Sequence, residues 1–191
     1  MPPFSINPGI YGGGEAGAMG YLAQFKIQFV GLSPGEHSFN YSIDSQFFSQ
    51  FENSVIQQGD LVVDLKLKKQ DNLMLLGFNI EGLLHVKCDR CAGDFDLPVK
   101  GFRELIMKPG DEEKELSENL VVISRNAHEI NVAQYIYEFI TLMVPSRIVH
   151  PDDAKGISGC DKKTLAVIKQ LEGKTKKADE RWEALKKLNI K

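Results

Sequence analysis

Apolar and polar residues alternate most clearly between residues 60 and 107, and this alternation predicts a series of strands. In the first strand every second residue is apolar: Leu61, Val63, Leu65 and Leu67. Turn residues 70–72 lead into a second apolar run at residues 73–80, and Gly82 and Gly101 mark further breaks before a last strand that ends at Met107. Strands adjacent in sequence usually pair with each other. We therefore predict an antiparallel β-meander that forms a barrel-like sheet.

Shorter segments before the meander extend the same pattern. Residues 24–30 and residues 38–43 each alternate as half-buried strands. Asp44 is placed to cap a short helix that runs to about Ser54, because an aspartate side chain accepts hydrogen bonds from the first free backbone N–H groups. The aromatic residues of this helix have the spacing expected of a buried side.

Segments after the meander supply the best predicted helix. Residues 109–119 are acidic and predict an exposed loop, and residues 120–123 predict a short strand. Asn131 can cap a helix that ends at Pro145, and the apolar residues between them follow helical spacing: Val132, Ile136, Phe139, Ile140 and Met143. Asp161 can cap a further helix with Leu165, Ile168 and Leu171 on one side, which Gly173 ends. The expected fold class is therefore α+β, with helices packed on the sheet and a basic helical C-terminal tail.

The two ends of the chain differ from this body and define the predicted domain boundaries. Residues 1–20 are rich in glycine and proline and lack periodicity, so we expect a disordered or vector-derived leader. Residues 12–17 match the dinucleotide-binding pattern G-x-G-x-x-G, but they lack the strand before and the helix after that give the pattern meaning. We assign residues 21–146 to a β-rich core domain and residues 147–191 to a His/Cys loop with a basic helical tail.

Charge is divided unevenly between these parts. Residues 147–191 carry 12 Lys and Arg against 7 Asp and Glu, whereas residues 1–146 carry 11 against 19. A basic arm on an acidic body suits RNA or an acidic protein surface, and a solvated helical tail is the alternative interpretation. Basic and aromatic residues of the last predicted helix and the linker before it are the candidate contacts: Lys174, Lys176, Lys177, Arg181, Trp182, Lys186 and Lys187.

Three cysteines and one histidine form the candidate chemical site. Cys88 and Cys91 are two residues apart at the predicted tip of a hairpin, the usual half of a zinc knuckle. His150 and Cys160 lie in one later loop and would complete a Cys3His set. Two alternatives remain open: the thiols stabilise a turn and a core, or Cys88 and Cys91 act as a redox pair.

Composition narrows the class of protein. Of the 191 residues, 42% are hydrophobic and 26% charged, as in a globular protein. Three cysteines do not make a secreted disulfide framework, and the sequence shows neither a membrane span nor a signal peptide. We also find no Ser/His/Asp series, no phosphate loop in a suitable context and no acid pair placed for catalysis. A cytoplasmic protein that is not an enzyme and has no small-molecule substrate is the expectation.

Several blocks of the sequence resemble one known family. The blocks are the C-D-R-C knuckle with Leu97-Pro98-Val99, the helix of residues 135–140 entering Val144-Pro145, the loop of residues 150–160, and the ending of residues 181–188. Together and in this order they resemble the YceD-like large ribosomal RNA subunit accumulation proteins, and more narrowly the Bacteroidetes-type branch. The resemblance extends from about Tyr21 to the end of the chain.

The resemblance implies a non-enzymatic factor needed for accumulation or processing of 23S ribosomal RNA. Its partners would be precursor 23S RNA or a nascent large-subunit ribosomal protein. Other branches of the family carry a second cysteine cluster where this chain has only His150 and Cys160, so one zinc ion on Cys88, Cys91, His150 and Cys160 is the expected cofactor. The alternative function is a zinc- or thiol-dependent protein-interaction or redox module unrelated to RNA.

Overall fold

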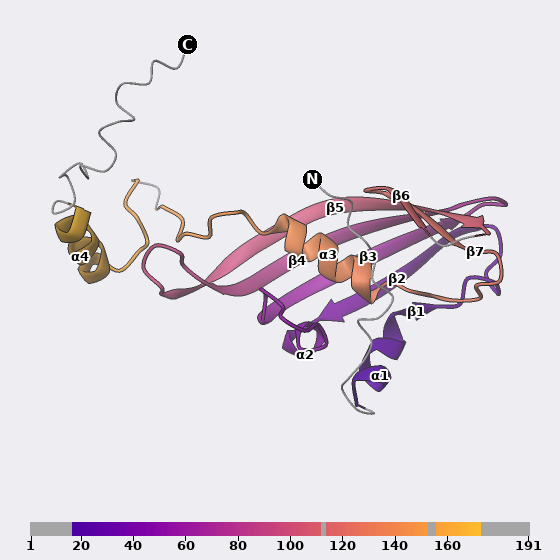
Figure 1. Cartoon of the computed structure of the whole chain (residues 1–191), viewed down its shortest axis with the longest axis horizontal. Coiled ribbons are helices and arrows are strands. Elements are labelled where there is room, and N and C mark those ends of the chain that lie inside the picture. Colours follow the sequence, from indigo (N-terminus) through magenta and orange to yellow (C-terminus); the bar gives the residue numbers. More distant parts are fainter. Residues whose placement is uncertain (1–16, 112–113, 153–155, 173–191) are drawn as a thin grey trace, which may run out of the picture. The chain divides into compact units, whose positions relative to one another are not determined.

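The chain forms two compact units, shown in the computed structural model of Figure 1, which describes residues 17–111, 114–152 and 156–172. The first, here called the sheet unit, comprises Met1–Val86 and Asp96–Ser146. The second, here called the cysteine unit, comprises Lys87–Phe95 and Arg147–Lys191. Each is described by itself.

The elements follow the order expected of an α+β protein. Those before the long strands are α1 (Gly17–Leu22), η1 (Ala23–Phe25), β1 (Lys26–Ile27), β2 (Gly35–Ile43) and α2 (Ser45–Phe48). The remaining ones are β3 (Gln58–Lys69), β4 (Met74–Lys87), β5 (Asp94–Gly110), β6 (Lys114–Ser117), β7 (Leu120–Ser124), β8 (Ile130–Asn131), α3 (Ala133–Met143) and α4 (Lys162–Glu172). None of the helices among the described residues is both long enough and apolar enough to cross a bilayer.

The main sheet has six strands in the order β2-β3-β4-β5-β7-β6. The pairs β2–β3 and β3–β4 are antiparallel, as a meander predicts. The end of the sheet beyond β5 departs from a meander. There β7 pairs in parallel with β5, and β6 pairs antiparallel with β7. In the described part of the chain the sheet is open, with β2 and β6 at its edges, so the expected barrel-like closure is wrong.

One face of the sheet and the helix α3 bury the core. Every second residue of β3 is buried, with Leu65 and Leu67 fully inaccessible to solvent. Figure 1 shows α3 lying across the sheet, and its Phe139 ring meets Phe78 of β4 edge-on at 5.1 Å. A Cβ on Gly101 of β5 would come within 2.8 Å of a Met143 side-chain atom, so α3 packs closely there. Burial of each such apolar side chain contributes about 1.5–3 kcal/mol.

One of the two caps predicted in the sheet unit is present. Asp44 accepts a hydrogen bond from Phe47 N at 3.1 Å and starts α2. The N-cap of α3 is Val132 and not Asn131; Asn131 lies one residue earlier and accepts a hydrogen bond from Ala133 N at 2.9 Å. The helix after Asp44 ends at Phe48, however, and not near Ser54, because the chain continues in single turns such as Gln50 N to Phe47 O.

Several predicted strand ends were wrong, because the length of a strand depends on the strand that it pairs with. The strand expected at residues 24–30 shortens to β1, which pairs with β8 and not with the main sheet. β4 continues through Gly82, and β5 continues through Gly101, so four expected strands are two. The acidic segment 109–119, expected as a loop, contains β6.

The ends of the chain lie largely outside the described residues. Of the expected leader, residues 1–16 are not described, and Gly17–Leu22 form α1. The predicted final helix and its contact candidates, residues 174–187, also fall outside the described residues.

Candidate metal centre

The hairpin tip between β4 and β5 forms a tight knuckle that positions Cys88 and Cys91. Cys88 follows the inward positions of β4 and is buried, with 2% of its surface exposed, whereas Cys91 is half-buried. Backbone hydrogen bonds close the turn, from Cys88 N to Gly93 O at 2.9 Å and from Ala92 N to Cys88 O at 2.8 Å. Ala92 takes a left-handed backbone conformation with φ of 57°. The knuckle thus brings the two thiols toward the same point.

The later loop supplies the other two candidate ligands. The His150 ring is held against Phe95 of β5 with ring centroids 4.5 Å apart. The loop closes on itself through the isolated bridge between Asp152 and Ser158 and the hydrogen bond from Gly159 N to Pro151 O at 3.3 Å. Cys160 follows this closure and is buried, immediately before α4.

A pair of hydrogen bonds fastens the knuckle to this loop. Asp89 N donates to Ile148 O at 2.7 Å, and Ile148 N donates to the Asp89 carboxylate at 2.6 Å. Ile148 lies two residues before His150, so Asp89 holds the backbone of the segment that carries the histidine and does not touch the ligand atoms. Sequence reasoning missed this role: Asp89 is visible inside the C-D-R-C motif, but its partner lies 59 residues away.

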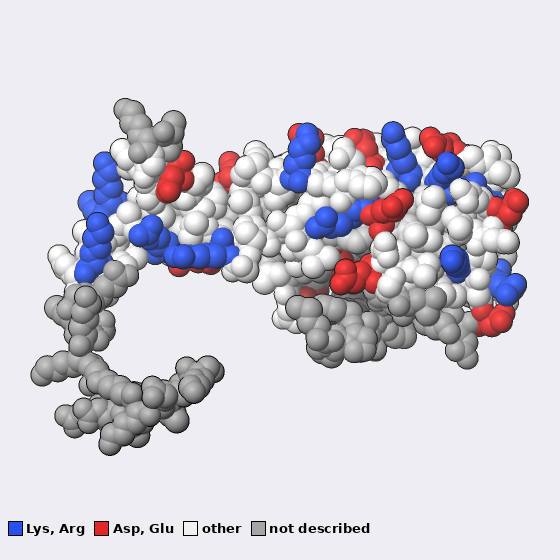
Figure 2. Space-filling view, turned by 90° about the horizontal axis from the view of Figure 1, so that it is seen from above, with Lys and Arg blue, Asp and Glu red and all other residues white. Residues whose placement is uncertain are grey.

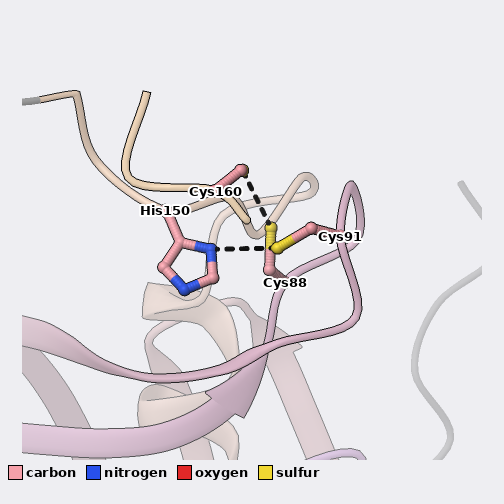
Figure 3. A group of neighbouring side chains, drawn as sticks. All are labelled: Cys88, Cys91, His150 and Cys160. Carbon is pink, nitrogen blue, oxygen red and sulfur yellow. Dashed lines mark hydrogen bonds between the residues drawn. The ribbon is translucent and has the colours of Figure 1, made fainter. Parts of the chain in front are cut away.

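The four candidate ligands come together as the sequence predicted (Figure 3). Their sulfur and nitrogen atoms all lie within 4.8 Å of one another. The Cys88 and Cys160 sulfurs are 3.7 Å apart, and the Cys91 sulfur is 3.4 Å from His150 Nδ1. All three cysteines are free thiols.

Two of these separations, between Cys88 and Cys160 and between Cys91 and His150, match a tetrahedral zinc site. With Zn–S bonds of about 2.3 Å and a Zn–N bond of about 2.05 Å, tetrahedral angles place two sulfurs about 3.8 Å apart and a sulfur and a nitrogen about 3.6 Å apart. The observed 3.7 Å and 3.4 Å lie close to these values. Soft thiolates with one imidazole favour zinc over magnesium or calcium, which prefer oxygen ligands.

Local hydrogen bonds favour the thiolate form of Cys88. Burial raises the pKa of Cys88, but N–H groups of Cys91, Arg90 and His150 point at its sulfur and lower the pKa to about 6. Ser158 donates to Cys160, which lowers its pKa, yet burial and the neighbouring sulfurs Cys88 and Cys91 raise it overall. Without a cation, the thiolate of one cysteine disfavours the thiolate of its neighbour. A bound cation would remove this conflict, because it stabilises every thiolate at once.

Helix α4 begins directly after the last ligand. Asp161 accepts hydrogen bonds from Thr164 N at 2.8 Å and Thr164 Oγ1 at 2.9 Å, and the Thr164 backbone N–H lowers the pKa of Asp161. Of the predicted apolar side of this helix, Leu165 and Ile168 are half-buried, whereas Leu171 is 58% exposed. The cap and the start of the helix were predicted correctly.

The other three histidines are described and do not join this site. His85 lies on the exposed face of the sheet between Asp96 at 2.6 Å and Asp60 at 3.1 Å. The candidate RNA or partner contacts between Lys174 and Lys187 are outside the described residues.

Comparison with known proteins identifies the family. No curated protein and no solved structure is significantly similar to the chain. The family model described as large ribosomal RNA subunit accumulation protein YceD matches residues 76–189, which include the knuckle, the His150–Cys160 loop and α4. This match covers more than half of the chain, so the protein belongs to the YceD family of large ribosomal RNA subunit accumulation proteins.

Proposed function

We propose that this protein is a non-enzymatic factor in the biogenesis of the large ribosomal subunit that supports accumulation or processing of 23S ribosomal RNA. The family match over residues 76–189 is the observation that carries the proposal. Its partner is precursor 23S RNA or a nascent large-subunit protein, met in the cytoplasm. The basic and aromatic residues between Lys174 and Lys187 remain contact candidates, and the Bacteroidetes-type branch remains a prediction.

We further propose that Cys88, Cys91, His150 and Cys160 hold one structural zinc ion. The donor set and its separations support this, since the set supplies the four ligands of a closed site. A closed site leaves no position for substrate or activated water, so the ion has a structural role. It would cross-link the knuckle to the loop before α4, two segments about 60 to 70 residues apart in the chain.

Depletion of the protein in its native cells tests the function. The measurement is a ribosome gradient together with the ratio of 23S to 16S RNA. We expect selective loss of 23S RNA and of large subunits, restored by the wild-type gene. Unchanged subunits and an unchanged ratio on full depletion would overturn the assembly role.

Metal analysis and thiol titration of the purified chain test the zinc site. We expect one zinc per chain, with Cys160→Ser losing most of it and Ser38→Ala retaining it, because Ser38 is exposed on β2 of the sheet unit and touches none of the candidate ligands. A wild-type chain without zinc that forms a reversible disulfide between Cys88 and Cys91 would instead support the alternative, a thiol-dependent redox module.

A further inference from the structure

The cysteine unit carries exposed positive charge that its own acidic residues do not neutralise. Among the described residues of this unit, five exposed cations form no ion pair: Arg90, Arg147, Lys162, Lys163 and Lys169. Three of its carboxylates have internal partners, because Asp89 holds Ile148, Asp94 pairs with Lys87, and Asp161 caps α4. On the face shown in Figure 2, blue side chains gather over this unit.

The lysines of α4 point away from the unit. Its half-buried residues Thr164, Leu165 and Ile168 occupy one side of the helix. With 3.6 residues per turn, Lys162 and Lys169 are stacked two turns apart on the flank next to Leu165, and Lys163 lies about 100° further round, opposite the half-buried side. All three lysines are exposed, so the helix presents positive charge around its solvent side.

Helix stability does not explain Lys162 and Lys163. The first turn of α4 contains these two lysines and no acidic residue, although Asp161 caps it. Cations in the first turn oppose the helix macrodipole, an effect of about 0.3–1 kcal/mol for an exposed charge, whereas Lys169 in the last turn complements it. The placement of Lys162 and Lys163, which costs stability, points to a use outside the helix.

Three of the five cations lie close to the candidate metal ligands in the sequence. Arg90 stands between Cys88 and Cys91, Arg147 is three residues before His150, and Lys162 is two residues after Cys160. We propose that the cysteine unit is an RNA-binding module whose Arg90, Arg147, Lys162, Lys163 and Lys169 contact backbone phosphates. This rests on the proposed role in ribosomal RNA accumulation and adds a binding surface to it.

The chemistry of the surface suits phosphates better than bases or a protein partner. The Phe95 ring packs on His150, and the described part of the cysteine unit has no exposed aromatic side chain. Base stacking and most protein hot spots depend on such aromatics. Exposed arginine and lysine side chains on a folded unit are sufficient for sequence-independent contacts with backbone phosphates.

Salt-dependent RNA binding by the full chain tests the module. The probes are a short fluorescent RNA duplex and a single strand of the same sequence, titrated between about 50 and 200 mM salt. The variant K162Q/K163Q/K169Q is expected to weaken binding and to reduce the slope of log K against log salt by about 2 to 3, since each phosphate contact contributes about 0.7–0.9.

A matched variant controls for net charge. K66Q/K68Q/K108Q removes three exposed lysines of the sheet unit, none of which forms an ion pair among the described residues, and it should retain the wild-type slope. R90Q should reduce the slope by about 1. Zinc content and circular dichroism verify that each variant is folded.

Three outcomes would overturn the module. They are a wild-type chain with no RNA affinity at low salt, an unchanged slope in the α4 variant, or an equal loss in the matched variant. The first, combined with binding to a purified large-subunit ribosomal protein, would assign the surface to a protein partner. The depletion experiment is independent of all three, because a factor can support 23S RNA accumulation without touching RNA.

Discussion

Asp89 allows the role of the knuckle in metal binding to be tested without altering a ligand. Its carboxylate accepts a hydrogen bond from Ile148 N at 2.6 Å, and Ile148 is two residues from His150. Removing a group that is hydrogen-bonded directly to a metal ligand typically lowers metal affinity about 10- to 100-fold, equivalent to about 1.4–2.7 kcal/mol. Asp89 acts one step further out, through the backbone of Ile148, so we expect Asp89→Ala to weaken zinc binding by about 10-fold, the lower end of this range.

Two further variants isolate the hydrogen bond from the charge. Asp89→Asn keeps an oxygen acceptor, so its affinity should lie between those of the wild type and Asp89→Ala. Asp94→Ala removes the same charge from the same knuckle, but Asp94 pairs only with Lys87 at the surface, at 2.7 Å, so it should bind zinc as the wild type does.

Competition with a chromophoric zinc chelator measures these affinities. The reasoning would be refuted if Asp89→Ala bound zinc as tightly as the wild type, or if Asp94→Ala lost as much affinity as Asp89→Ala. In the first case the loop would hold His150 without the knuckle. In the second, the negative charge of the knuckle and not the geometry of the hydrogen bond would set the affinity.

Two predictions concern the sheet unit. A Cβ on Gly82 would lie 2.3 Å from the backbone oxygen of Asp60, which cannot move without breaking the β3–β4 ladder, so Gly82→Ala should cost about 3 kcal/mol or more and lower the Tm by about 6–12 °C. Gly77→Ala should cost less, because its nearest neighbour is an exposed ring that can rotate away; equal losses in thermal unfolding would contradict this. The Asp96 hydrogen bond, with that of Asp60, raises the pKa of His85. Protonated His85 therefore stabilises the fold below about pH 6.5, and this contribution disappears as the pH rises through the raised native pKa. The stability difference between wild type and His85→Gln, from denaturant titrations, should be larger at about pH 5.5 than at about pH 8, and a pH-independent difference would show that the ion pairs contribute nothing.

Local patterns were sufficient where each residue's environment depends on its near neighbours. Alternation in β3 correctly identified its buried side, from Leu61 to Leu67. The caps at Asp44 and Asp161 were correct because a cap involves residues only three positions away. The C-x-x-C spacing also predicted a knuckle, since two thiols at that spacing can converge in a single turn.

Tertiary structure decided what depends on distant partners. The sequence of residues 24–30 is that of a strand, but β1 has only β8 to pair with and is two residues long. β7 pairs in parallel with β5, and among the residues that the structure describes β2 and β6 are not paired with each other, so the sheet is open; no local pattern distinguishes a parallel neighbour from an antiparallel one. Gly82 was expected to break a strand, but its positive φ lets β4 continue.

The candidate metal centre shows both contributions. The sequence by itself supplied the four residue types and their two local groups, Cys88 with Cys91 and His150 with Cys160. That the two groups meet, with sulfur and nitrogen atoms within 4.8 Å, depends on the closure of the loop on the knuckle through Asp89 and Ile148. Such closure joins residues 59 positions apart, and a contact at that separation depends on the packing of the whole chain between them.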